Sequence, residues 1–250
     1  MPSAAEQMAA NLSWNSFGKA KDLQRRIFYA LGLLIVYRIG TYIPVPGIDA
    51  SQLRSFFEQA NTGIGGMLNM FTGGAVGRMA IFALGIMPYI TSSIIMQLLA
   101  SMVPQLEQLK KEGEQGRRKR TNYVRLGTLL LAIFQSMGFA IALSSQGMAI
   151  DPGTMFIFTA VVSFVTGTMF LVWLGEQVNE RGIGNGISLI IFASIVSGLP
   201  SAIGQSFEGA RQGEISLILL LTVAFMAILA ISFIVWVERA QRRVTVNFAR

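Results

Sequence analysis

Long apolar stretches, separated by short charged segments or by segments containing glycine and proline, form the main pattern along this chain. A helix needs about 20 predominantly apolar residues to cross a bilayer. The pattern predicts six such helices. They cover approximately residues 27–43, 79–103, 123–143, 156–174, 187–203 and 215–237. The predicted fold class is therefore all-α, a polytopic membrane helix bundle.

A shorter apolar segment, residues 64–76, precedes the second predicted span. It is too short to cross a bilayer, and glycines bound it on both sides: Gly63, Gly65 and Gly66 before it, and Gly73, Gly74 and Gly77 at its end. We expect a half-helix that enters the membrane region and turns back. Irregular backbone at membrane depth is tolerated only where protein buries it or where it lines a wet cavity. The segment therefore predicts a pore or a binding vestibule.

Prolines refine two of the predicted spans. Pro44 and Pro46 should end the first span, because proline lacks the N–H that a helix needs. Pro88 lies inside the second and should bend it. Residues 1–18 lack the apolar core and cleavage site of a signal peptide. Residues 1–26 fit two interpretations, a helix at the cytoplasmic interface or a disordered lead-in.

Charge supports the membrane assignment and predicts an orientation. Hydrophobic residues make up 52% of the chain and charged residues 13%, whereas soluble domains have about 25% charged residues. With a cytoplasmic N-terminus, only Arg54, Arg78 and Arg211 face outward, as the positive-inside rule requires. A full span at residues 64–76 would reverse the orientation of every later segment and place the basic residues 110–120 outside. We therefore expect residues 64–76 not to cross.

The chemistry of the chain excludes several classes of function. Cys and His are absent, which removes disulfides and the usual transition-metal ligands. No acidic residue lies in the middle of a predicted span, whereas ion-coupled transporters need ionisable groups at that depth. We expect neither an enzyme nor a bound cofactor. The glycine-rich residues 182–186 lack the lysine and the strand of a phosphate loop, and should form the entry to the fifth span, with Asn185 or Ser188 as the helix cap.

Arg38 lies well inside a predicted span, about twelve residues into the first. Two interpretations stay open. Arg38 either pairs with a partner in a wet interior or lies near the outer boundary and extends its guanidinium to the membrane surface. The basic residues near 110–120 also have two interpretations, a topology signal that attracts anionic lipid or a surface for an acidic or phosphate-rich cytoplasmic partner.

Several motifs closely resemble those of the SecY family, the central subunit of the bacterial protein-conducting channel. They are NMFTGGA (69–75), IFALGIMPYI (81–90), KKEGEQGRRK (110–119), GTMFLVWLGEQ (167–177), ERGIGNGIS (180–188) and VERAQRR (237–243). The resemblance implies a fold of ten spans in two halves. This chain then holds a first half at residues 27–204, a sixth span at 215–237 and the start of a cytoplasmic loop at 238–250, after the N-terminal segment 1–26.

The resemblance also implies functional residues. Ile86, Ile90, Ile187 and Ile191 match an apolar pore ring, and residues 64–76 match the plug that blocks the resting channel. Thr91 and Gln135 match polar positions of a lateral gate. The plug residues are Ile64, Met67, Leu68, Asn69, Met70, Phe71 and Thr72, and the cytoplasmic basic loop comprises Lys110, Lys111, Arg117, Arg118, Lys119 and Arg120.

The implied function is passage of unfolded secretory polypeptides across the bacterial inner membrane and release of membrane segments into it. The implied partners are SecE and SecG, the motor ATPase SecA or a translating ribosome, a polypeptide with a signal sequence, and anionic lipid, with ribosomal RNA as a further contact of the cytoplasmic loops. Without the resemblance, the pattern also fits a passive small-solute channel or a lipid-binding scaffold.

Overall fold

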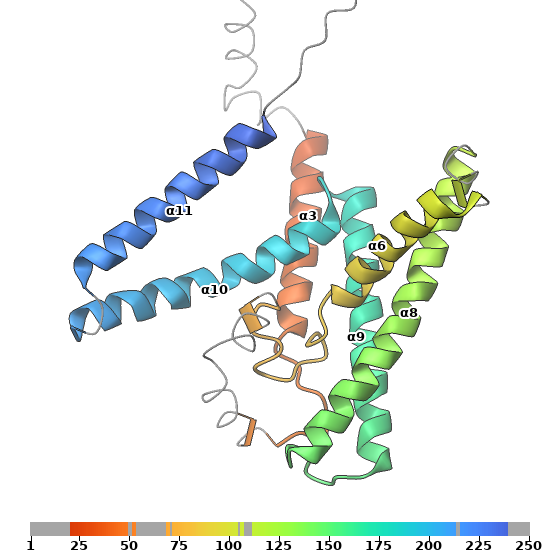
Figure 1. The fold of residues 1–250 in the computed structure, drawn as a ribbon, viewed down its shortest axis with the longest axis horizontal. Coiled ribbons are helices and arrows are strands. Elements are labelled where there is room, and N and C mark those ends of the chain that lie inside the picture. Colours follow the sequence, from red (N-terminus) through yellow and green to blue (C-terminus); the bar gives the residue numbers. More distant parts are fainter. Residues whose placement is uncertain are drawn as a thin grey trace, which may run out of the picture. The chain divides into compact units, whose positions relative to one another are not determined.

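The computed structural model describes residues 21–49, 52–53, 69–70, 72–104, 106–107, 112–213 and 216–239. They belong to two compact units, one ending at Gly198 and one beginning at Leu199. The main helices in Figure 1 are α3 (Lys21–Gly40), α6 (Met87–Met102), α8 (Glu114–Ser145), α9 (Thr154–Arg181), α10 (Gly186–Arg211) and α11 (Leu217–Glu238). The described residues contain isolated β-bridges but no strand, so they confirm the all-helical class.

Four helices in the described part of the chain are long and apolar enough to cross a membrane: α8, α9, α10 and α11. They support a multi-pass membrane protein. Helix α6 has 16 residues, fewer than the about 20 that a span needs. Helix α3 carries Asp22, Arg25 and Arg26 in its first described turns. Six spans remain a prediction.

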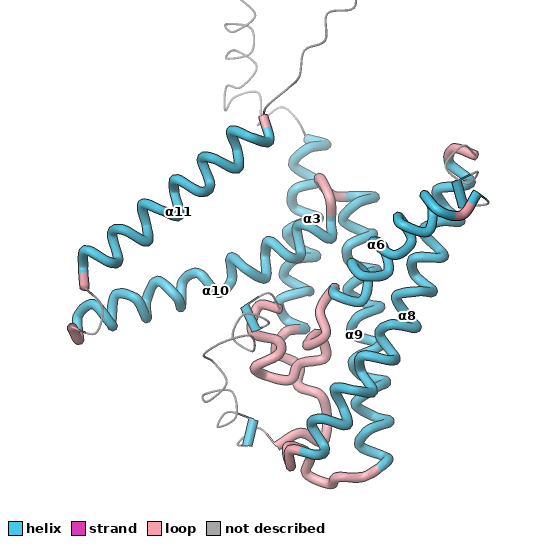
Figure 2. Tube along the Cα trace, viewed as in Figure 1, coloured by secondary structure: helices cyan, strands magenta, loops and turns pink. Residues whose placement is uncertain are grey.

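The second predicted span differs from the structure in where its helix begins. Residues 79–86 form turns, and helix α6 starts only at Met87 (Figure 2, where these turns are pink). The expected bend at Pro88 is wrong, because Pro88 lies in the first turn of α6. The first N–H groups of a helix have no partner within it, so proline costs nothing there. Pro88 therefore helps to start α6.

The segment expected as a half-helix is only partly described. Residues 64–68 and 71 lie outside the described part of the chain, and residues 72–76 form turns, so a helix reaching Val76 is wrong. Glycines explain the difference, since Gly73 and Gly74 have φ of 63° and 85°. A helix requires negative φ, and glycine adopts the opposite sign without a steric penalty.

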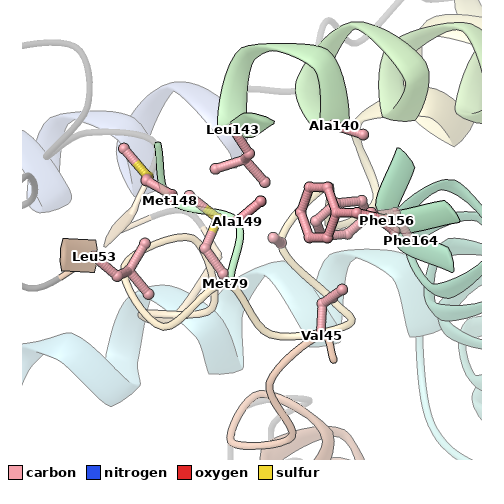
Figure 3. Close-up of a cluster of buried hydrophobic side chains, with 11 residues drawn as sticks. Val45, Leu53, Met79, Ala140, Leu143, Met148, Ala149, Phe156 and Phe164 are labelled. Carbon is pink, nitrogen blue, oxygen red and sulfur yellow. The ribbon is translucent and has the colours of Figure 1, made fainter. Parts of the chain in front are cut away.

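A first apolar cluster lies where α8 and α9 meet the turn segments (Figure 3). Leu143 of α8 and Phe164 of α9 pack there with Val45 and Met79. The chain that leaves α3 lies beside the chain that leads to α6: the N–H of Val45 donates to the carbonyl of Met79 at 2.9 Å, and that of Ile81 donates to the carbonyl of Ile43 at 3.0 Å. These bonds satisfy backbone groups that have no helix to pair them.

Small residues set the spacing between helices, as is common in membranes. Ser92 of α6 donates its hydroxyl hydrogen to the carbonyl of Val124 on α8 at 2.8 Å, and a side chain at Gly127 would collide with that hydroxyl. On α9, a side chain at Gly167 would overlap the carbonyl of Ile81. These contacts hold α6 against α8 and the turn segment against α9.

Candidate pore constriction

The four isoleucines predicted as ring members lie in one apolar cluster within the first unit. Ile86 and Ile187 are buried members of this cluster, and Ile90 and Ile191 are partly buried and pack against it. They come from two segments that are about a hundred positions apart in the sequence. Tertiary packing therefore brings together in one apolar cluster the residues that the motifs singled out.

Ile86 is held at the start of α6 but outside it. It is the N-cap residue, with φ −98° and ψ 2°. Its carbonyl accepts the N–H of Tyr89 at 3.0 Å and that of Ile90 at 3.1 Å. Ile86 lies outside the helix, but its carbonyl accepts the first helical hydrogen bond, from Ile90. Ile86 and Ile90 are therefore still one helical turn apart, as their spacing predicts.

Ile187 is positioned by the cap of α10 and by a close approach of two glycines. The side-chain oxygen of Asn185 accepts the N–H of Ile187 at 3.1 Å, which confirms Asn185 as the cap. A side chain at Gly186 would overlap the carbonyl of Gly175 on α9, and one at Gly175 would lie 2.5 Å from the terminal carbon of Ile187. The two glycines therefore let the start of α10 lie directly on α9.

A cavity of about 140 Å³ lies beside these isoleucines. Ile86, Ile90 and Ile191 line it, together with Tyr37, Thr72, Gly85, Met87, Leu171, Ile190 and Ser194. Sequence reasoning did not identify Tyr37 and Ser194. Ser194 could have been found, because it follows Ile187 and Ile191 on the same face of a helix. Tyr37 has no such signal, since only folding brings α3 to this place.

The end of the predicted plug forms part of this wall. The side-chain oxygen of Asn69 accepts the N–H of Gly77 at 2.7 Å. The backbone carbonyl of Asn69 accepts the N–H of Gly74 at 2.8 Å. Thr72 adds a bond from its hydroxyl to the carbonyl of Asn69 at 3.2 Å. These bonds tie Asn69 to the turns of residues 72–77, and Thr72 lines the cavity.

Arg38 has interior polar partners. One terminal nitrogen donates to the carbonyl of Gly73 at 2.7 Å and to the hydroxyl of Ser197 at 3.1 Å, and the other donates to the hydroxyl of Tyr42 at 3.1 Å. Its guanidinium also lies 5.1 Å from the centre of the Tyr42 ring. The structure thus gives the charge of Arg38 neutral oxygen acceptors as partners, at a side chain that is half-buried near the end of α3.

The two predicted gate residues lie on neighbouring helices, Thr91 on α6 and Gln135 on α8. Both side chains are half-buried. The Thr91 hydroxyl donates to the carbonyl of Met87 in its own helix at 3.0 Å. Among the residues that the structure describes, no hydrogen bond joins Thr91 to Gln135, so their gate role stays a prediction.

The predicted basic loop is helical over most of its length. Arg117, Arg118, Lys119 and Arg120 lie in the first turns of α8, so the prediction of a loop is wrong for these four, while Lys110 and Lys111 lie outside the described residues. Nearby, Arg125 forms a two-bond ion pair with Glu176 of α9, at 2.7 and 2.5 Å. A polar cavity of about 540 Å³ lies at this end and carries both signs of charge, including Arg117 and Glu114.

Comparison with known proteins decides the family. The family model described as SecY matches residues 80–250. The chain belongs to the SecY family. Protein translocase subunit SecY of Escherichia coli (strain K12) is 57% identical over 237 residues, which cover 93% of this chain and 54% of that protein. The protein of the same name from Pseudomonas aeruginosa is 54% identical over 239 residues, 96% of this chain and 54% of that protein. The SecY resemblance of the motifs is confirmed.

Solved structures show that the fold is shared. Sec61 in the canine ribosome-channel complex from the endoplasmic reticulum matches with a TM-score of 0.65 at 19% identity, over 90% of this chain and 50% of that chain. A structure described as that of a protein conducting channel matches with a TM-score of 0.57 at 20% identity, over 76% of this chain and 42% of that chain. This SecY family member thus spans about half the length of the SecY relatives described above.

Proposed function

We propose that this chain supplies one side of a channel that passes unfolded secretory polypeptides across a membrane and releases membrane segments sideways. The observation that carries the proposal is the convergence of Ile86, Ile90, Ile187 and Ile191 in one apolar cluster beside a cavity, in a chain of the SecY family. Branched apolar side chains resist wetting when a constriction is closed. They also offer a passing chain no fixed hydrogen bonds or charges.

The driving force for this transport comes from outside the chain. The described residues hold no group of three or more Asp, Glu, Cys or His side chains that could bind a metal, and the sequence shows no nucleotide site or mid-span acid. We propose SecA or a translating ribosome as the source of force and SecE and SecG as further subunits, in the bacterial inner membrane with a cytoplasmic N-terminus. The cations Arg117–Arg120 at the start of α8 would face these cytoplasmic partners or anionic lipid.

Two further roles belong to the same proposal. Residues 64–76 act as a plug that blocks the resting channel, supported by the contact of Thr72 with the cavity. Thr91 on α6 and Gln135 on α8 contribute to a lateral gate, supported by the packing of these two helices. A solved structure of 21% identity and TM-score 0.57 is described as showing that the plug domain of the SecY protein stabilises the closed state of the translocation channel.

The test places polar groups in the constriction of a complete channel that carries this sequence. Ile86→Asn with Ile187→Asn should raise resting ion conductance in planar bilayers and allow export of substrates with weak signal sequences, because amides favour hydration of the constriction. If the isoleucines only pack helices, the buried amides should instead lower the amount of folded protein, at about 1–3 kcal/mol each.

A matched control uses exposed positions on the same two helices. Ile94→Asn with Phe192→Asn changes α6 and α10 at side chains that are 52% and 61% exposed, and should leave conductance unchanged. If the ring variant folds poorly, Ile90→Asn with Ile191→Asn repeats the test at the partly buried members. Normal conductance in every folded ring variant would overturn the proposal, as would small-solute conduction without any polypeptide transport.

A further inference from the structure

Two adjacent residues near the end of α3 bind the same short piece of backbone. The Tyr37 hydroxyl lies 3.3 Å from the carbonyl of Thr72, and a terminal nitrogen of Arg38 donates to the carbonyl of Gly73 at 2.7 Å. Each also reaches a serine of α10. Tyr37 and Ser194 share a bond of 2.6 Å between their hydroxyls, and Arg38 donates to the hydroxyl of Ser197 at 3.1 Å.

The backbone that they hold is the end of the proposed plug. Tyr37, Thr72 and Ser194 are the polar side chains among the residues that line the cavity beside the ring. All three are nearly buried, with exposed fractions of 3%, 8% and 3%. Hydrogen bonds in such an apolar setting are stronger than bonds exposed to water. A polar contact therefore joins three segments, α3, the plug end and α10, beside the constriction.

We propose that Tyr37 and Arg38 are positioning residues that hold the end of the plug against α10 in the resting channel. They set how readily the plug leaves. This inference rests on the proposed channel function and deepens it, because it names the groups that hold the closed state. Release of the plug end requires that these bonds break while every buried donor still finds an acceptor.

The hydroxyl hydrogens have two complete arrangements. With the plug in place, Ser194 donates to the Tyr37 oxygen and Tyr37 donates to the Thr72 carbonyl, using the contacts at 2.6 and 3.3 Å. With the plug gone, Tyr37 donates to the Ser194 oxygen, and Ser194 donates to the carbonyl of Ile190, which lies 2.8 Å away. A hydroxyl is both a donor and an acceptor, so each arrangement satisfies both hydrogens.

The Arg38 guanidinium also has other partners if the plug end leaves. When the Gly73 carbonyl leaves, the guanidinium keeps the hydroxyls of Ser197 and Tyr42 and the face of the Tyr42 ring. Gly73 suits this contact, because its φ is 63° and a side chain there would lie 3.2 Å from the Ser197 hydroxyl and 3.3 Å from the Arg38 nitrogen. The absence of a side chain lets the carbonyl approach closely. The contact is therefore specific and reversible.

The experiment measures the opening of the plug end directly. Val76→Cys introduces a thiol into these 250 residues, which have no cysteine. Any cysteine in the remainder of the complete channel is replaced by serine, and a membrane-permeant maleimide then reports how often the segment is exposed. Tyr37→Phe and Arg38→Gln should each raise the labelling rate about three- to tenfold, the loss expected for one hydrogen bond. Both should also allow export of substrates with weak signal sequences.

Tyr29→Phe is the matched control. It removes the same atom from the same helix, α3, but this hydroxyl donates to the side-chain oxygen of Gln177 on α9 at 3.3 Å and does not touch the plug end. Labelling should change less than about twofold, because the bonds to Thr72 and Gly73 stay. Tyr37→Phe keeps the ring that stacks on Phe82 at 6.0 Å, and it carries the test if Arg38→Gln folds poorly.

The outcomes separate this inference from the channel proposal. Unchanged labelling in folded Tyr37→Phe protein would overturn the inference, as would an equal increase in Tyr29→Phe. Neither result affects the ring test, which measures conductance in other variants. Conversely, normal conductance in the ring variants would overturn the channel proposal, whereas the labelling rate would still show whether Tyr37 and Arg38 hold this segment.

Discussion

At the scale of single residues, the glycine that begins α10 leaves no room for a side chain. An added carbon at Gly186 would overlap the carbonyl of Gly175 and lie 2.7 Å from the Cβ of Val178. The N–H of Gly186 also donates to the side-chain oxygen of Asn179 at 2.7 Å. The absence of one side chain therefore places Ile187 in the apolar cluster.

Gly186→Ala should destabilise the protein by about 1–3 kcal/mol, because helices α9 and α10 must separate to admit the methyl group. Thermal unfolding in detergent measures this. Gly204→Ala is the control, since it lies in the same helix with nothing within 4 Å of the added carbon, and it should be neutral or stabilising by about 0.5–1 kcal/mol. Equal unfolding temperatures for the two variants would contradict the close-approach explanation.

At the scale of helices, α8 and α9 are joined by apolar packing, which includes the rings of Phe139 and Phe164, and by an ion pair at the polar end. Arg125 and Glu176 meet through two parallel bonds, with side chains 45% and 16% exposed. Two N–H groups of the planar guanidinium align with the two oxygens of a carboxylate, and this geometry strengthens the pair. This contact fixes α8 relative to α9 next to the basic turns of α8.

A double-mutant cycle with Arg125→Gln and Glu176→Gln should give a coupling free energy of about 0.5–1 kcal/mol, after allowing for the exposure of the arginine. The pair Asp22 and Arg26 is the control. These residues lie four apart in α3, at 83% and 50% exposure, and should couple by about 0.3–0.5 kcal/mol or less. Higher salt should weaken the control pair more. If the coupling free energy of Arg125 with Glu176 is no larger than that of the control pair, the two parallel bonds do not stabilise the protein further.

At the scale of the whole molecule, the division of charge predicts the topology. Gln115 lies in the basic first turn of α8, and Gln212 follows the last residue of α10. With α8, α9 and α10 as three spans, these two positions belong to opposite sides of the membrane. Arg211 then is one of the few cations that face outward.

Single cysteines at Gln115→Cys and Gln212→Cys should therefore react with an impermeant reagent from opposite sides of the membrane. We choose Gln212 over the neighbouring Gly213 because Gly213 has φ of 79°, which a cysteine would strain. Gln146→Cys, in the connection between α8 and α9, should react from the same side as Gln212→Cys. Reaction of Gln115→Cys and Gln212→Cys from one side would show that one of the three helices does not span.

The sequence by itself determined the all-helical membrane class and the SecY family, since both follow from apolar length and from contiguous motifs. It also predicted the Asn185 cap, because capping depends on neighbours only a few residues away. It did not predict where α6 begins, because Pro88 is compatible with both a bend and a helix start until the partners of the preceding turns are known.

Only the tertiary structure decided which polar groups line the cavity beside the four isoleucines. Tyr37, Thr72 and Ser194 come from three separate segments, and no local pattern links them. The same holds for Arg38, because its acceptors at Gly73 and Ser197 come together only when α3, residues 72–73 and α10 pack against one another. Local sequence determines helix formation and capping, whereas contacts between distant segments depend on how close the backbones can approach, which glycines such as Gly73 and Gly186 set in three dimensions.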